Sequence, residues 1–242
     1  MRPLITAAGL VALWWALQAG FQIPDYLLPS PPSVARALWV QRATLGQGVL
    51  TTGMETLLGL ALGTLMGMAS ALLIASSAML ARWLLPLLLL SQAVPAFALA
   101  PLLVLWFGFG VASKVVMAAI MIFFPIASAF HDGLARVPAA WIDLARSMGA
   151  APWRVLWLVR VPAALPSLGS GLRVAACWAP VGAVIGEWVG ASAGLGTIML
   201  NANARVRTDL TFAALLLLSA MTIGLWWAVD RALRRALFWE AG

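Results

Sequence analysis

The sequence predicts an all-α fold: a polytopic membrane bundle of about six transmembrane helices with both termini in the cytoplasm. Composition is the first reason, because hydrophobic residues make up 63% and charged residues 10% of the 242 residues, and the mean hydropathy is +0.98. Soluble domains are roughly 45–50% apolar and about 25% charged. The second reason is that the apolar residues fall into separate long stretches, and the third is that most arginines lie between them. These features are typical of an integral membrane protein.

Six apolar stretches each approach the ~20 residues that a helix needs to cross a bilayer. They cover residues 4–21, 51–75, 83–107, 115–130, 165–189 and 210–229. The first stretch follows Arg2 and so resembles a cleaved signal peptide. Its apolar run is longer than that of a typical signal peptide, so we expect a retained helix.

The distribution of basic residues sets the predicted orientation. If the N-terminus is cytoplasmic, the inside set is Arg2, Arg82, Arg136, Arg146, Arg154, Arg160, Arg173, Arg231, Arg234 and Arg235, and the outside set is Arg36, Arg42, Lys114, Arg205 and Arg207. This excess inside agrees with the positive-inside rule. Because these residues lie at helix ends, the net charge of +7 gives no reason to expect a nucleic-acid partner. Residues 24–48 are then external, and Ser33 is placed to N-cap a short surface helix over 34–40.

Two of the stretches carry glycines at every fourth position. The first set is Gly59, Gly63 and Gly67, and the second is Gly182, Gly186, Gly190 and Gly194, of which the last pair is expected to leave the membrane. Residues four apart share one helix face, so each set forms a smooth surface that lets another backbone approach closely. Tight packing and helices that slide or rotate against their neighbours are both compatible with this pattern.

The third stretch is interrupted by prolines at positions 86, 95 and 101, with Ser91 and Gln92 just before the second of them. An interior proline removes a backbone hydrogen bond and bends a helix. Broken helices at membrane depth occur where they line a cavity or are buried in protein. The run from Ser91 to Pro95 is therefore a candidate for a solute path, and a kink filled by packing is the alternative.

Two carboxylates lie within the apolar stretches, near their predicted external ends. Ionisable residues at membrane depth are costly and default to functional candidates. Glu55 and Glu187 either contact a solute that enters from outside or pair structurally with Arg205 or Arg207.

Tryptophans form a further set of candidates, because an indole ring can stack on an aromatic solute. The chain has 13 tryptophans, and most of them suit anchoring at the membrane interface instead. The candidate residues of the solute path are Glu55, Ser91, Gln92, Trp178, Glu187 and Trp188.

The cytoplasmic loop at about 132–165 contains a short amphipathic helix. One face of this helix is formed by residues at i, i+3, i+4 and i+7, namely Trp141, Leu144, Ala145 and Met148. Asp143 and Arg146 are spaced to pair beside that face, and Gly149 suits a left-handed C-cap. Such a helix either docks in a groove of a soluble partner or lies on the lipid surface, and Arg154 and Arg160 suit both roles.

Several expected signs of an enzyme are missing. The chain has no Gly-x-x-x-x-Gly-Lys-Ser/Thr phosphate loop, and the glycine-rich run at 190–197 has no lysine. A single cysteine, Cys177, and a single histidine, His131, exclude a disulfide framework and a Cys/His metal cluster. We therefore expect no ATP hydrolysis, no bound cofactor and no metal in this chain.

The loop resembles the EAA motif of bacterial ABC importer permeases, in which Glu-Ala-Ala is followed after three residues by Gly, and after nine more by Ile-x-Leu-Pro. The corresponding residues here are Asp143, Leu144, Ala145, Gly149, Val159, Val161 and Pro162. The segments 28–31, 100–108, 161–166 and 194–196 resemble the nitrate/sulfonate/taurine-type branch of these permeases.

This resemblance implies a type I ABC importer permease fold, with residues 1–242 as one permease domain in the bacterial inner membrane. It also implies a second permease subunit, most simply a copy of this chain. Two ABC ATPase subunits that hold ATP and Mg, and a periplasmic or lipid-anchored substrate-binding protein, complete the expected assembly. The residues implied to couple to the ATPase are Trp141, Asp143, Leu144, Ala145, Met148 and Gly149.

The solute is suggested by two segments, 91–101 and 186–191, which look most like those of permeases for thiamine pyrimidine precursors. An acidic Glu187 beside Trp188 suits a neutral or weakly basic heterocycle better than an anion. Import of a sulfonate, taurine or nitrate by the same machine is the alternative. A secondary transporter or channel is the alternative from another class, but its inverted repeats and midplane carboxylates are not found here.

Overall fold

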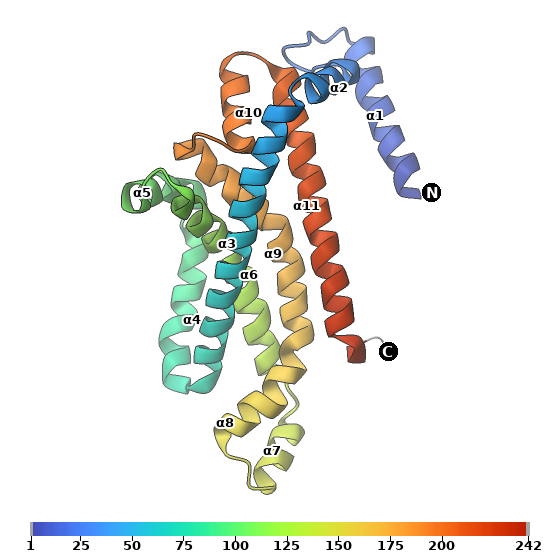
Figure 1. The fold of residues 1–242 in the computed structure, drawn as a ribbon. Helices are drawn as coiled ribbons and strands as arrows, with labels where there is room; N and C mark the ends of the chain where they lie inside the picture. Colours follow the sequence, from blue (N-terminus) through green and yellow to red (C-terminus); the bar gives the residue numbers. More distant parts are fainter. Residues whose placement is uncertain (1, 241–242) are drawn as a thin grey trace.

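The computed structural model describes residues 2–240, and within them the chain is helical with no β-strand. Figure 1 shows long, roughly parallel helices with short helices across both ends. The elements are α1 (Arg2–Gly20), α2 (Pro31–Val40), α3 (Arg42–Ser76), α4 (Ala78–Ala93), α5 (Ala96–Phe107), α6 (Val111–Ala135), α7 (Ala139–Ser147), α8 (Pro152–Val155), the π-helical turn η1 (Leu156–Arg160), α9 (Val161–Gly190), α10 (Leu195–Ala204), α11 (Thr208–Ala236) and the 3₁₀ turn η2 (Phe238–Glu240).

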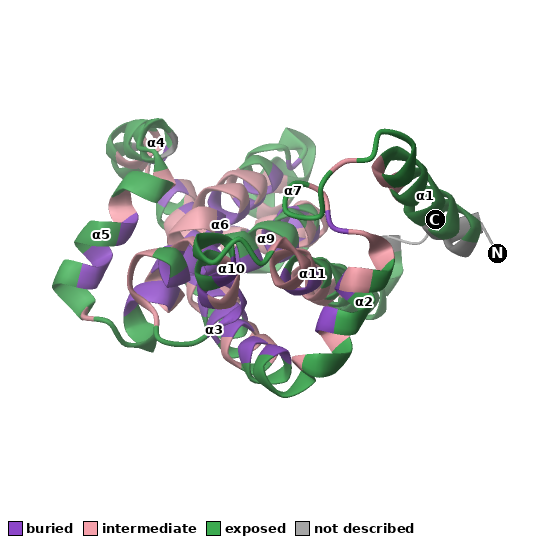
Figure 2. Ribbon diagram, turned by 90° about the horizontal axis from the view of Figure 1, so that it is seen from above, coloured by how far each residue is buried: buried purple, intermediate pink, exposed green. Residues whose placement is uncertain are grey.

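The centre of the bundle is α6, which is held between α3 and α9. Buried residues are concentrated where these three helices meet, whereas α1, α4 and α5 are mostly exposed (Figure 2). Ala118, Ile122 and Ile126 of α6 are fully buried. The outer helix α11 is tied to α9 by an ion pair of 2.7 Å between Arg173 and Asp230.

Glycines of both predicted sets face α6, namely Gly59, Gly63 and Gly67 from α3 and Gly182 and Gly186 from α9. A Cβ atom at Gly63 of α3 would lie 2.8 Å from the carbonyl oxygen of Ala119, and one at Gly182 of α9 would lie 2.7 Å from the Cα of Ala118. The backbones approach so closely because these glycines have no side chain. The prediction of close helix approach is confirmed. Gly194 lies beyond the end of α9 and has a φ of +123°.

The third predicted stretch is broken, as its prolines indicated. It forms α4 and α5, whose axes meet at 101°. Pro95 lacks a backbone N–H and disfavours helical geometry in the residue before it. Val94 accordingly has an extended conformation, with a ψ of 120°, and α5 begins after Pro95.

Helices cover all six predicted stretches, and the third is divided between α4 and α5. Within the residues that the structure describes, four helical segments are long and apolar enough on their own to cross a bilayer: α3, α6, α11 and the continuous segment from α8 through α9. The bent pair of α4 and α5 makes a fifth if it is counted as one span. The first predicted stretch forms α1, a helix of 19 residues whose apolar part includes Ala8–Gly20. This helix stands apart from the bundle and stacks Trp14 on Phe212 of α11 at 5.8 Å.

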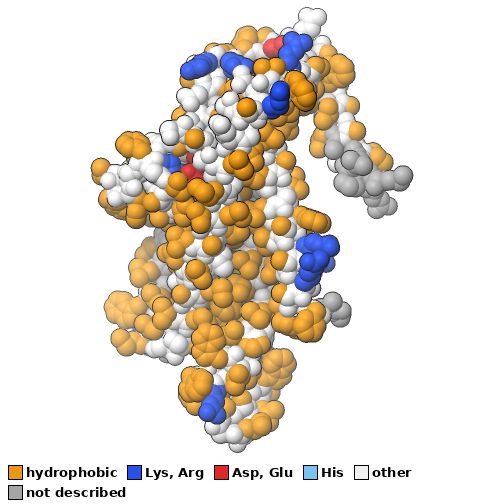
Figure 3. All heavy atoms as spheres, in the orientation of Figure 1, with side chains coloured by type: hydrophobic (Ala, Val, Ile, Leu, Met, Phe, Trp, Pro, Cys, Tyr) orange, Lys and Arg blue, Asp and Glu red, His pale blue; other side chains and the backbone are white. Residues whose placement is uncertain are grey.

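Short helices lie at the two ends of the bundle. In Figure 1, α2 and α10 lie at one end and α7 and α8 at the other. Figure 3 shows apolar side chains over most of the visible face, with basic groups near both ends and on the flank at the lower part of α11, as in a membrane protein. The predicted start of α2 is wrong: the helix begins at Pro31, with Ser30 as N-cap, because proline suits the first helical position. The Ser33 hydroxyl instead donates to the carbonyl oxygen of Ser30 at 2.7 Å.

The close approach of α3 to α6 yields a matched pair of variants. Gly63→Ala places a methyl group against Ile122 and the Ala119 carbonyl, whereas Gly46→Ala in the same helix meets nothing within 4 Å. We expect Gly63→Ala to cost about 1–3 kcal/mol of stability and so to lower the thermal unfolding midpoint in detergent by about 3 °C or more. Gly46→Ala should leave the midpoint unchanged or raised, because alanine favours the helix. Equal midpoints in the two variants would contradict this packing.

Candidate functional site

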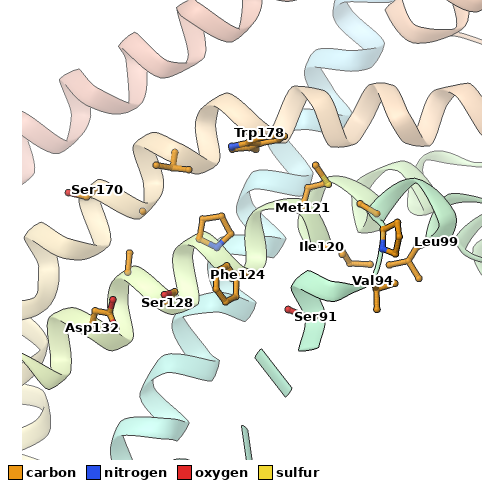
Figure 4. A pocket seen from close by; sticks show the side chains of 16 residues that line it. Ser91, Val94, Leu99, Ile120, Met121, Phe124, Ser128, Asp132, Ser170 and Trp178 are labelled. Carbon is orange, nitrogen blue, oxygen red and sulfur yellow. The ribbon is translucent and has the colours of Figure 1, made fainter. Parts of the chain in front are cut away.

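A pocket with a volume of about 720 Å³ opens where the α4–α5 bend faces α6 and α9. Figure 4 shows side chains from these three regions around one space. Its lining includes Ser91, Val94 and Pro95 from the bend, Phe124, Ser128 and Asp132 from α6, and Ser170 and Trp178 from α9. The proline break thus contributes one wall of the pocket.

The pocket is apolar and aromatic, with a few polar groups. Its lining contains two aromatic side chains, Phe124 and Trp178, and three serine hydroxyls. Asp132 is the only ionisable group among the lining residues, which include no arginine, lysine or histidine. An apolar cavity with few polar groups is the usual form of a small-molecule site.

The predicted solute-path residues do not form a single site. Ser91 and Trp178 line the pocket, whereas Glu55, Glu187 and Trp188 do not. The side chain of Gln92 lies outside the described part of the structure.

The sequence analysis missed the α6 residues of the pocket, among them three that share a regular spacing. Phe124, Ser128 and Asp132 line the pocket at a spacing of four, so they share one helix face. Their spacing was visible in the sequence. Asp132 had been assigned to the loop, but α6 continues to Ala135.

Glu187 is enclosed near the end of α9 and fixes the turn into α10. The Thr52 hydroxyl donates to its Oε1 at 2.5 Å, and the Gly196 amide donates to its Oε2 at 2.5 Å. The Thr52 oxygen in turn accepts from the Leu195 amide at 2.8 Å. A Cβ at Gly194 would collide with the Glu187 carboxylate, so this turn requires glycine. Glu187 therefore connects α3, α9 and α10.

A buried lysine lies beside this carboxylate cluster. The Lys114 ammonium donates to the carbonyl oxygens of Phe109, Gly110 and Gly190, at 2.6, 2.9 and 2.6 Å. Gly190 is the last residue of α9, so Lys114 caps the negative end of that helix. The side chain is 1% exposed, which corrects its predicted position in an external loop.

The predicted pairing of the two glutamates with Arg205 or Arg207 is wrong. The Glu55 carboxyl lies against that of Glu187, with Lys114 nearby, and both glutamates are buried. The close packing around α6 encloses these groups, and Oε2 of Glu55 is buried without a hydrogen-bond partner. Arg207 instead pairs with Asp209 at 3.7 Å.

The short helix of the loop, α7, has no buried residue. Trp141, Leu144 and Met148 are 54%, 61% and 79% exposed, so its apolar face is open. Asp143 and Arg146 pair at 3.9 Å, as their spacing indicated.

The helix ends as the sequence predicted. Gly149 has a φ of +79°, and its amide donates to the carbonyl oxygen of Arg146 at 2.9 Å. The Ala150 amide reaches back to Ala145 at 3.0 Å, which completes a left-handed C-cap. Helix resumes at Pro152 with the short helix α8.

Comparison with known proteins identifies the family. Residues 59–236 match the family described as binding-protein-dependent transport system inner membrane component. The chain belongs to this family. It is a multi-pass inner-membrane permease of the ABC importer class, which replaces the alternatives of a secondary transporter or a channel.

Curated relatives match the permease over most of its length. A probable ABC transporter permease protein of Haemophilus influenzae is 47% identical over 98% of this chain and 97% of its own length. The formylaminopyrimidine transport permease protein ThiX of Halalkalibacterium halodurans is 34% identical over 86% and 84%. The taurine transport system permease protein TauC of Escherichia coli is 31% identical over 96% and 86%. The permease is thus of the nitrate/sulfonate/taurine type, with relatives for more than one class of solute.

The fold is also that of a solved permease. A chain of the methionine ABC transporter MetNI matches with a TM-score of 0.71 at 23% identity, covering 81% of this permease and 97% of that chain. This match supports the type I importer permease fold.

Adjacent threonines of α3 test the cluster around Glu187. Thr52→Val leaves the Leu195 amide and one oxygen of Glu187 without their partner. We expect a loss of about 1–3 kcal/mol, seen as an unfolding midpoint about 3 °C or more lower in detergent. Thr51 donates only to Gln47 of its own helix, so Thr51→Val should change stability by no more than about 0.5 kcal/mol. Equal losses in both variants would exclude the role given to Thr52.

Proposed function

We propose that this permease forms the path of an ATP-driven importer for a neutral or weakly basic aromatic heterocycle, such as a thiamine pyrimidine precursor. The single observation that carries this proposal is the lining of the pocket. Phe124 and Trp178 supply faces on which a flat ring can stack, and Asp132 supplies an acceptor for ring amino groups.

The same lining argues against an anionic solute. Sites for sulfonates and similar oxyanions use arginine, lysine or backbone N–H donors. The pocket offers none of these cationic side chains among its lining residues, and Asp132 would repel an anion. The similarity to ThiX supports a heterocyclic solute, whereas the similarity to TauC supports taurine. The relatives alone therefore do not identify the solute of this permease.

The exposed face of α7 supports coupling to an ATPase. Three large apolar side chains, Trp141, Leu144 and Met148, project from a helix at one end of the bundle. Such a face fits a groove in a soluble protein. In this proposal two ATPase subunits hold ATP and Mg, a second copy of this permease completes the path, and a binding protein delivers the solute.

The first experiment is a ligand screen on the binding protein encoded with this permease. Thermal stabilisation is measured against thiamine pyrimidine precursors, flavins, taurine, alkylsulfonates and nitrate. Stabilisation by a pyrimidine or flavin supports the proposal, and stabilisation by a sulfonate, taurine or nitrate overturns the heterocycle assignment. Co-purification of the permease from its native membrane should also recover an ABC ATPase.

Two tryptophans of α9 separate pocket contacts from surface anchoring. We expect Trp178→Ala to lower uptake of the stabilising solute by about three- to tenfold, because a stacking face is lost. Trp188 is 40% exposed and does not line the pocket, so Trp188→Ala should transport normally. The measurement is uptake into proteoliposomes at equal amounts of complex. Normal uptake by Trp178→Ala, or an equal loss in both variants, would remove the pocket from the solute path.

The end of α7 provides a test of coupling. Gly149 has open space around it, so Gly149→Val acts through backbone conformation alone. A branched side chain at this positive φ costs about 1–2 kcal/mol or more. We expect Gly149→Val to reduce uptake about tenfold or more with normal membrane insertion, and Gly149→Asn to be milder because asparagine tolerates this conformation. Ala145→Glu should abolish uptake by placing a charge on the docking helix.

Gly110→Val is the matched control for the backbone variants. Gly110 also has open space, but its φ is −72°, and it lies before α6 rather than beside α7. Uptake at the normal rate by a well-inserted Gly149→Val permease would refute the coupling role of α7.

A further inference from the structure

One arginine holds the ends of two transmembrane helices. The Arg160 Nη1 donates to the carbonyl oxygen of Ala75 at 3.1 Å, and its Nε and Nη2 both donate to that of Leu134 at 3.1 Å. Ala75 lies in the last turn of α3, and Leu134 lies in the last turn of α6. The guanidinium therefore connects both helices to the segment that begins α9.

The contact suits the electrostatics of helix ends. The last carbonyls of a helix lack partners within the helix and carry the negative end of its dipole. Two such ends meet at one positive group, and the planar guanidinium has donors on separate edges that reach both. A lysine ammonium at position 160 would not reproduce this fork.

Arg160 is the last residue of the π-helical turn η1, which joins α8 to α9. The Val161 amide donates to the carbonyl oxygen of Leu156, five residues earlier, as a π turn requires. Pro162 follows directly and cannot donate at all. Single π turns within helices are rare and are frequent at functional sites. The segment that joins α8 to α9 is thus irregular at Arg160, the residue that bonds the ends of α3 and α6.

One side of α7 faces a cavity that Arg160 also lines. A cavity of about 550 Å³ lies between α7, α8 and the end of α3. Ile142 and Arg146 of α7 line this cavity together with Arg160 and its acceptor residue Ala75. The helix with the open apolar face and Arg160 therefore border the same cavity.

We infer that Arg160 is a positioning residue that transmits displacement of α7 and α8 to the ends of α3 and α6. The step from α6 to the solute path is short, because Asp132 lies two residues before Leu134, and Ser128 lies one turn earlier on the pocket face. Movement of the α6 end therefore reshapes the pocket wall. This inference rests on the proposed coupling role of α7.

The test measures access to the pocket without any transported solute. In the complete complex, Cys177→Ser removes the single native thiol and Ser128→Cys places a reporter in the pocket. Labelling by N-ethylmaleimide is followed in inside-out vesicles, with and without ATP, Mg and vanadate. We expect trapping to change the labelling rate by about fivefold or more in this background. With Arg160→Ala, the change should fall below about twofold while vanadate still traps nucleotide.

Three further variants make the result decisive. Arg160→Lys keeps the positive charge but not the planar guanidinium that reaches both carbonyl oxygens. It should give a change in labelling rate between that of the background and that of Arg160→Ala. Arg231→Ala removes an arginine of α11 that packs over Trp227, and should behave as the background. Ala145→Glu should abolish the change by disturbing α7.

The outcomes separate this inference from the proposal beneath it. A full labelling change in Arg160→Ala, with none in Ala145→Glu, overturns the role of Arg160 alone. A full change in Ala145→Glu overturns the coupling role of α7, and this inference with it. If both Arg160 variants lose nucleotide trapping in proportion to the amount of intact complex, Arg160 is merely structural and the inference is again overturned.

Discussion

The close approach of α6 to α3 on one side and α9 on the other is the constraint on which the site depends. Glycines on α3 and α9 bring the three backbones together, so two sides of α6 are occupied by helix backbone. The face that carries Phe124, Ser128 and Asp132 remains open and lines the pocket. Tight packing and an open cavity are thus consequences of the same arrangement, in which glycine determines where helices touch.

The two ends of α6 are each held by one basic side chain. At one end, Lys114 of α6 bonds the last carbonyl of α9 and the connection from α5. At the other end, Arg160 bonds the last turns of α3 and α6. Both contacts use a cation at the negative end of a helix. Between these fixed ends α6 lines the pocket, so this helix can relate events at the loop to the shape of the cavity.

Features encoded in short stretches of sequence were predicted well. The glycine spacing predicted the helix contacts, Pro95 predicted the break between α4 and α5, and Gly149 predicted the end of α7. Each depends on neighbours a few residues away. The partners of Glu187 were not predicted, because Thr52 is 135 residues distant and nothing local marks the pair. The π turn at Arg160 and the burial of Lys114 were missed for the same reason, since both depend on packing between distant helices.

The burial of Lys114 also decides how this subunit responds to chemical reagents. Lys114 is the only lysine in the sequence, and three carbonyl oxygens surround its amine. The basic groups at the surface are guanidinium groups, which acylating reagents do not attack at neutral pH. Amine-directed cross-linkers applied to an assembled complex will therefore report on the lysines of its partners, and no side chain of this subunit will carry the label. The exposed thiol of Cys177, directly before Trp178, is the natural point of attachment.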